Sequence, residues 1–254
     1  MAESRQGKTQ AAVTEGGSAL SRYQKVVVGR GGLLHLLYFE ICMQFTYAPG
    51  ALGLFLRKLF WSRLFRRCGR GAVFGAGVLL RHPNRIELGD RVVISEGCVL
   101  DARSDDVDCA IAIGDDTILG NAVTLSCKTG TIRIGARGGL GTQTVVHAVA
   151  GCAVELGDDM IIGPSCYIAG GGNYEVDRLD VPMSQQGLRD DEGVKLAGDN
   201  WLGAKVVVLP GANMGAGAVA AAGAVVSKPV PERAIVAGVP AKVVRMRGES
   251  DTPA

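Results

Sequence analysis

The sequence has few aromatic residues, little net charge and no long apolar run. Aromatics make up 5% of its 254 residues, against 37 glycines, and the formal net charge is +2. Such a composition suits a β architecture rich in corners better than a core of large rings. So small a charge gives no field for nucleic acid, which we do not expect as a partner. The apolar segments 33–45 and 51–68 are shorter than the roughly 20 uninterrupted apolar residues of a transmembrane helix.

The cysteines give no sign of a disulfide scaffold or of a metal site. There are seven, an odd number, and no two stand in a CxxC pair. Small secreted domains carry a denser and paired set, so a reducing cytoplasm is the expected location. The polar N-terminus also lacks the apolar segment that a signal peptide needs. We expect no metal cofactor.

The first 70 residues differ in charge from the rest of the chain. They hold eleven Lys/Arg and three Asp/Glu, whereas the later residues hold sixteen and twenty-two. Residues 1–30 are polar and are predicted to form a disordered tail. Residues 31–70 are predicted to form an amphipathic helical segment, broken at Pro49-Gly50.

The second predicted helix, 51–68, mixes large apolar residues with basic ones such as Arg57, Arg63 and Arg66. This composition is typical of a basic helix that lies on an anionic membrane. Two roles stay open: peripheral contact with the inner face of the membrane through 51–70, and capping of the open end of the domain that follows.

A period of six residues dominates the C-terminal half. Six aliphatic residues stand six apart, and most are followed by a small residue: Leu196, Leu202, Val208, Met214, Ala220 and Val226. A helix would return apolar positions every three to four residues and a single strand every two. A period of six therefore indicates a short strand plus a corner, and three of these units close one triangular coil. The position two residues earlier is also apolar, except at Asn200.

The same frame extends back to Leu88, and its phase breaks at regular intervals. The breaks follow Leu100, Leu125, Val146 and Ile168, each after three units of six residues. All insertions must then leave the coil at one corner. We predict that the excursions beginning near 103, 129, 150 and 170 lie in one vertical stack.

Several motifs in this frame carry a resemblance to a known family. They are Gly198-Asp199-Asn200-Trp201-Leu202-Gly203, Val208-Leu209-Pro210-Gly211, Ala222-Gly223-Ala224-Val225-Val226-Ser227-Lys228 and Gly238-Val239-Pro240-Ala241-Lys242-Val243. The chain resembles the hexapeptide-repeat acyltransferases, and among them the sugar and polysaccharide O-acetyltransferases that include maltose and xenobiotic acetyltransferases. The resemblance implies an all-β fold, a left-handed parallel β-helix over 71–231 with an N-terminal helical extension, an inserted loop at 169–193 and a C-terminal tail at 232–254.

The resemblance also implies a catalytic loop, from which this sequence departs. In the family the loop carries a histidine after an asparagine, followed by an Asp, an Asp-x-Pro and a Gln-Gly. Here Asn173 is followed by Tyr174, while Asp177 and the later residues keep the frame. Asn173 and Glu175 are then candidate substrate contacts, and Asp177 or Glu175 is a candidate carboxylate to assist the base.

His147 is the alternative base, because it stands at the corner from which the insertions leave. Its column otherwise holds mostly small residues: Asp101, Ser126, Ala169, Leu209 and Ser227. An imidazole titrates near neutral pH, whereas a phenol such as Tyr174 titrates near 10. Three readings stay open: His147 is the base, Tyr174 acts in a modified site, or the protein is a catalytically silent homologue. His82, beside Pro83, is predicted to be structural.

The implied activity is acetyl transfer from acetyl-CoA to a hydroxyl of a sugar or a polysaccharide precursor, lipid-linked acceptors included. The alternatives are N-acetylation of an amino sugar and a silent scaffold. The resemblance places the cofactor against Trp201, Gly203, Ala221, Ser227, Lys228 and Arg245, in a groove between the subunits of a homotrimer. A carbonic anhydrase of this fold would need three histidines on zinc, and only His82 and His147 lie in or near the coils.

Overall fold

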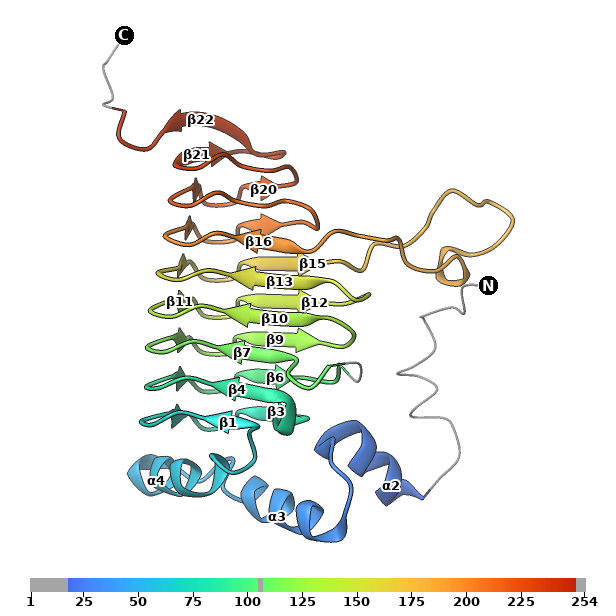
Figure 1. The fold of residues 1–254 in the computed structure, drawn as a ribbon, viewed down its shortest axis with the longest axis vertical. Coiled ribbons are helices and arrows are strands. Elements are labelled where there is room, and N and C mark those ends of the chain that lie inside the picture. Colours follow the sequence, from blue (N-terminus) through green and yellow to red (C-terminus); the bar gives the residue numbers. More distant parts are fainter. Residues whose placement is uncertain (1–17, 105–106, 250–254) are drawn as a thin grey trace.

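The computed structural model describes residues 18–104 and 107–249, and it is a parallel β-helix with helices packed at one end (Figure 1). The helices are α2 (Ala19–Tyr23) with a π-helical continuation (Gln24–Val28), α3 (Leu33–Met43) and α4 (Gly50–Trp61), and short 3-10 turns span Pro83–Arg85 and Met183–Gln185. The strands stack into three sheets, of six, nine and seven strands, that form the faces of the coil. We call these faces sheets A, B and C.

The strands of each sheet follow in stacking order. Sheet A holds β1 (Arg67–Cys68), β4 (Ile86–Leu88), β7 (Ile111–Ile113), β10 (Thr131–Ile134), β13 (Ala153–Leu156) and β16 (Val194–Leu196). Sheet B holds β2 (Val73–Phe74), β5 (Val93–Ile94), β8 (Ile118–Leu119), β11 (Gly139–Leu140), β14 (Ile161–Ile162), β17 (Trp201–Leu202), β19 (Val219–Ala220), β21 (Ala234–Ala237) and β22 (Lys242–Met246). Sheet C holds β3 (Leu79–Arg81), β6 (Val99–Asp101), β9 (Thr124–Cys127), β12 (Val145–Ala148), β15 (Tyr167–Gly170), β18 (Val207–Val208) and β20 (Val225–Val226).

The strand register confirms the period of six. In sheet C, Leu125 pairs with Val146, and Val146 pairs with Ile168, each on the next coil. All three side chains are buried. Because every coil repeats this arrangement, the aliphatic positions form continuous columns inside the coil, and burial of these columns supplies the core.

The insertions leave the coil at one corner, as predicted. Strands β6, β9, β12 and β15 all belong to sheet C, and the strands that follow them, β7, β10, β13 and β16, all belong to sheet A. The four connections therefore lie in one stack, on the right of Figure 1. The longest connects β15 to β16 and projects from the coil as an arm.

Small residues at the corners serve a close approach between coils. Gly114 follows β7, and a Cβ built on it would lie 2.6 Å from the carbonyl carbon of Gly135 in the next coil. The left-handed backbone positions fall two residues later, at charged residues such as Asp116 and Arg137, with φ of 56° and 58°. The sequence did not reveal this division of roles between neighbouring corner positions.

The N-terminal helices cap the open end of the coil. Trp61 is fully buried and its ring centroid lies 5.7 Å from that of Phe74, while Phe65 stacks on Phe74 at 5.4 Å. Leu36 and Phe39 of α3 belong to the same apolar core as the first coils. The capping role considered from the sequence is thus present in the structure.

The structure corrects the prediction that Arg57 belongs to the basic surface of α4, because this residue is buried. Its side chain is 2% exposed. It donates hydrogen bonds to the carbonyl oxygens of Phe74, Phe45 and Ala48, each at 2.9 Å. The guanidinium therefore ties α4 to the end of α3 and to the first coil, and it adds no charge to the surface.

The structure extends the ordered domain beyond the predicted bounds of 31–70 and 71–231. Part of the predicted 1–30 tail is helical, and Val28 enters the core; residues 1–17 lie outside the described residues. His82 anchors this helix. Its backbone N–H donates to the carbonyl of Val27, and its ring Nε2 lies 2.9 Å from the carbonyl oxygen of Lys25. His82 is structural, as predicted.

The coil also continues past residue 231. Strand β21 pairs in parallel with β19, and Val236 occupies the column of Ala220. Strand β22 then folds back antiparallel on β21 and ends sheet B. The predicted C-terminal tail, 232–254, therefore began too early. Pro231 and the charged residues after it interrupt the apolar pattern, so the inward positions of Ala234 and Val236 were not recognised in the sequence.

Asn200, the polar exception to the inward pattern, has its hydrogen bonds satisfied. It is 1% exposed. Its Oδ1 accepts from the N–H of Gly198 at 3.1 Å, and its Nδ2 donates to the carbonyls of Gly215 and Ala218 at 2.7 and 3.2 Å. A buried amide with these partners joins two coils, because a polar group is tolerated in a core only when it is hydrogen-bonded.

Candidate active site

His147 lies on β12, a central strand of sheet C, near the end of the strand that meets the corner of the insertions. It pairs with Ser126 of the coil below and with Ala169 of the coil above. Asp101 pairs with Ser126 one coil further down. The predicted column is confirmed over these four residues. Adjacent strands are about 4.8 Å apart, and the residues directly beside the imidazole on both sides, Ser126 and Ala169, carry small side chains.

The surroundings of His147 lower its pKa below the ordinary value for histidine. Burial of the half-buried ring is the main cause and the positive charge of Lys128 adds to it, while Asp101 acts in the opposite direction. Within residues 18–104 and 107–249, the ring makes no hydrogen bond. His147 is therefore neutral at pH 7, and a ring nitrogen is available to accept a proton.

Asp101 is buried and held by two arginines. Both of its carboxylate oxygens accept from Arg103 at 2.7 Å, and Oδ2 also accepts from Arg81 at 3.3 Å. These bonds fix the carboxylate in place. It acts on the His147 ring as a fixed charge from lower in the column and makes no direct contact with it.

The long insertion begins as a two-stranded arm. Tyr174 forms an antiparallel bridge with Leu188, and the backbone N–H of Arg189 donates to the carbonyl of Asn173 at 2.8 Å. Asp191 binds Asn173 twice, at its backbone N–H and at its side-chain amide, both at 2.9 Å. The arm is thus closed at its base, and Tyr174 is 47% exposed on it.

The candidate carboxylates of the arm face an arginine of the arm itself. Arg189 lies 3.4 Å from Glu175 and 3.6 Å from Asp177. Among the residues that the structure describes, the charges that act on His147 are those of Lys128 and Asp101. A single chain therefore keeps Asp177 and Glu175 paired within the arm and does not bring them to His147.

The candidate cofactor residues flank the outer face of sheet C in the upper coils. Gly203 and Ala221 follow β17 and β19 at the corner between sheets B and C, whereas Ser227 and Lys228 follow β20 at the corner of the insertions. Trp201 projects from β17 of sheet B and is 54% exposed. Arg245 lies on β22 and donates to the carbonyl of Glu249 at 3.1 Å. The apolar outer positions of sheet C lie between the two corners.

Three charged residues around the site were missed from the sequence. Lys128 directly follows β9 and stands two residues after Ser126, so continuing the alternation of the strand by one residue would have placed it on the side of Ser126. Arg189 and Asp191 carried no such signal, because the bridge between the two sides of the arm sets their partners.

Two curated proteins with similar sequences are named as acetyltransferases. The probable acetyltransferase Rv3034c of Mycobacterium tuberculosis is 29% identical to this chain over 168 residues. The match covers 64% of this chain and 55% of that protein. YJL218W of Saccharomyces cerevisiae is 36% identical over 102 residues, 40% of this chain and 50% of that protein. Both names assign acetyltransferase activity provisionally. In sequence, the chain is similar to proteins named as acetyltransferases.

The matches cover part of each relative. The chain spans about half the length of the curated relatives that it matches. No family model matches the sequence. Among solved structures, the polySia-specific acetyltransferase NeuO aligns with a TM-score of 0.49 and 16% identity, over 73% of this chain and 85% of that one.

Proposed function

We propose that the protein is an acetyl-CoA-dependent O-acetyltransferase with His147 as general base, acting on a hydroxyl of a sugar or a polysaccharide precursor. The observation that carries the proposal is the His147 imidazole, which is held neutral beside the arm with its ring nitrogens free of hydrogen bonds within the described residues. The other positions in the column of His147 hold mostly small residues, so packing does not account for a ring of this size. The acetyltransferase names of the matched relatives support the same reaction class.

The proposed reaction is a direct transfer. His147 removes the proton of the acceptor hydroxyl while that oxygen attacks the thioester carbonyl of acetyl-CoA. The C–S bond then breaks, the acetyl ester remains on the acceptor, and the CoA sulfur leaves with the proton returned by His147. Backbone N–H groups near Gly203, or at the glycines that begin the arm, are candidates to stabilise the oxyanion. Lys228 and Ser227 would hold a phosphate of CoA.

A homotrimer is part of the proposal. The arm projects away from its own coil (Figure 1), and within one chain its carboxylates are paired with Arg189. Acetyl-CoA would lie along sheet C, in a groove that a neighbouring subunit completes, as the family resemblance implies. The same geometry also suits the amine of an amino sugar, which makes N-acetylation the second candidate.

Transfer of a labelled acetyl group tests the proposal. The purified protein is incubated with acetyl-labelled CoA and with neutral sugars, amino sugars, nucleotide sugars and lipid-linked sugars. A product that releases its label to hydroxylamine is an ester, and a resistant product is an amide. Binding of acetyl-CoA with no transfer to any acceptor would instead favour the silent scaffold.

The pH profile should respond to two neighbours of His147 in opposite directions. Activity requires the neutral ring, so it should fall as the pH drops through a pKa below 6.5. Lys128→Met removes a charge that lowers this pKa, and the acid limb of kcat/KM should move to higher pH. Asp101→Asn removes the charge that raises it, and the limb should move to lower pH. Lys205→Met, an exposed control, should leave the limb in place; shifts of the same sign in both test variants would contradict the assignment.

A further inference from the structure

The helices that cap the coil are apolar on both sides. Toward the coil, α3 and α4 bury Leu36, Phe39 and Trp61. On the side facing away, they expose large apolar residues at helical spacing: Leu34 81%, Leu37 50%, Ile41 53%, Leu52 68%, Phe55 60% and Leu59 47%. A helix that only caps a coil would present polar residues to water. We call this outward surface the basal face.

The basal face is bordered by basic residues without acidic partners. Residues 18–70 contain nine Lys/Arg and one acidic residue, Glu40, which accepts a hydrogen bond from the Tyr23 hydroxyl at 2.6 Å. Some of the nine are used internally, such as Arg57 in the core and Arg66 with Glu87 at 2.8 Å. Five are exposed and have no carboxylate partner within the described residues: Lys25, Arg30, Lys58, Arg63 and Arg67.

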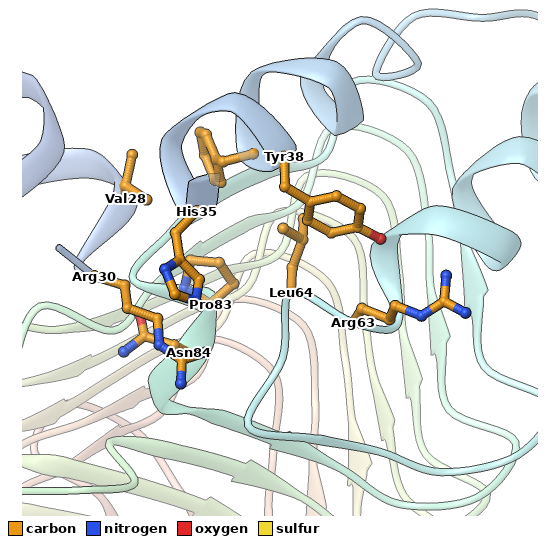
Figure 2. Close-up of a pocket in the computed structure, with 9 residues that line it drawn as sticks. Val28, Arg30, His35, Tyr38, Arg63, Leu64, Pro83 and Asn84 are labelled. Carbon is orange, nitrogen blue, oxygen red and sulfur yellow. The ribbon is translucent and has the colours of Figure 1, made fainter. Parts of the chain in front are cut away.

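A cationic hollow lies at the edge of this face. Figure 2 shows His35 and Tyr38 projecting from α3, with Arg30 and Arg63 on opposite sides of the hollow. Asn84 and Pro83 of the first coil form its floor. The hydroxyl of Tyr38 donates to the carbonyl of Phe60 at 2.7 Å. The two guanidiniums and the imidazole at the border of an apolar surface provide donors that a phosphate group requires.

We propose that the basal face docks on the surface of an anionic lipid bilayer. The apolar stripes of α3 and α4 enter the boundary between headgroups and acyl chains, and Arg30, Lys58 and Arg63 contact lipid phosphates. This docking rests on the helices alone and is independent of the acetyltransferase activity. It extends the contact predicted from 51–70 to include α3 and Arg30. It leaves out Arg57, which is buried, and Arg66, which pairs with Glu87.

Charge favours a membrane over a second copy of the chain as the occupant. Two basal faces in contact would bring two basic borders together with only Glu40 to offset them, which is unfavourable. A membrane surface rich in anionic lipids has the complementary sign. Within the described residues no single helix is long and apolar enough to cross a bilayer; Ala19–Val28 and Leu33–Met43 pass that test only as a pair, bent by 68°. Lying in the interface fits short apolar helices of this kind.

Docking in this way sets the height of the candidate active site. Strand β12 is three positions above β3 in sheet C, which corresponds to about 14 Å at a strand spacing of about 4.8 Å. The helical layer adds about 10 Å. With the coil axis upright on the membrane, His147 would stand about 25 Å above it.

Vesicle flotation at low salt tests the docking. The full chain is mixed with phosphatidylcholine vesicles with and without phosphatidylglycerol, and should bind only those with the anionic lipid. Each basic residue near such a surface strengthens binding about fivefold, so Lys58→Glu with Arg63→Glu should weaken it at least about 25-fold. Leu34→Asn with Phe55→Asn should weaken it at least about tenfold through lost apolar insertion.

Matched controls alter the same residue types on the coil. Ile161→Asn and the pair Lys205→Glu with Lys242→Glu change exposed residues and should keep wild-type binding. The proposal is overturned if the wild-type chain binds neither vesicle, or if the controls lose as much binding as the basal variants. It is also overturned if gel filtration shows a dimer that the basal variants dissociate while vesicles stay unbound. Circular dichroism confirms that each variant is folded.

Discussion

Replacing His147 with alanine is expected to lower kcat/KM for acetyl transfer by about 10²–10⁴-fold, the usual cost of losing a general base. The ring is neutral at pH 7, because burial and Lys128 lower its pKa. It also stands beside the open corner, between Ser126 and Ala169. Steady-state kinetics with an acceptor found in the labelled-transfer assay measure the loss. Equilibrium binding of acetyl-CoA should stay near the wild-type value, because the proposed role of His147 is toward the acceptor.

Tyr174→Phe separates the two candidate bases. The tyrosine is exposed on the arm and pairs through its backbone with Leu188. The variant keeps the ring and loses only the hydroxyl, so its effect should be much smaller than that of His147→Ala. A dead tyrosine variant with an active histidine variant would reverse the assignment, and two active variants would exclude both residues as the base.

Arg57→Met is expected to lower the free energy of unfolding by about 3–5 kcal/mol, through the loss of charge-assisted hydrogen bonds in the interior. The variant leaves the carbonyls of Phe45, Ala48 and Phe74 without the donor that each now has at 2.9 Å. Those carbonyls belong to the turn after α3, to the residues just before α4 and to strand β2. The first coil should therefore lose its cap first, because each coil of a repeat fold is stabilised by its neighbours.

Urea unfolding measures the change, and Lys58→Met is its control. Lys58 is adjacent to Arg57 on α4 and exposed, so its substitution should change the stability by no more than about 0.5 kcal/mol. Hydrogen exchange should show faster opening of α4 and β2 in Arg57→Met. Equal losses of stability in the two variants would mean that the buried guanidinium has no special role.

The coil was predictable from sequence because its rule is local and repeated. The spacing of Leu125, Val146 and Ile168 fixed which residues point inward and which corner carries the insertions, and the strand pairs agree. His147 was found in the same way, since a large polar ring in a column of small residues departs from the repeat. Even Asn200 fits, because the exception to the pattern proved to be a buried amide with partners in its own and the next coil.

The same reasoning failed where partners come from distant parts of the chain. Arg57 has the spacing of a surface residue on a basic helix, yet it points into the cap because three carbonyls converge there. Asp177 keeps its place in the family motif, yet within one chain it lies 3.6 Å from Arg189, whose position depends on how the arm closes.

By itself, the sequence determined the repeat, its register, the corner of the insertions and the histidine at that corner, because a period of six constrains each coil in the same way. Only the tertiary structure decided the charges around His147, the direction of Arg57 and the apolar outer side of α3 and α4. Those features depend on side chains that meet across coils and helices, and a pattern along the chain carries no information about which of them meet.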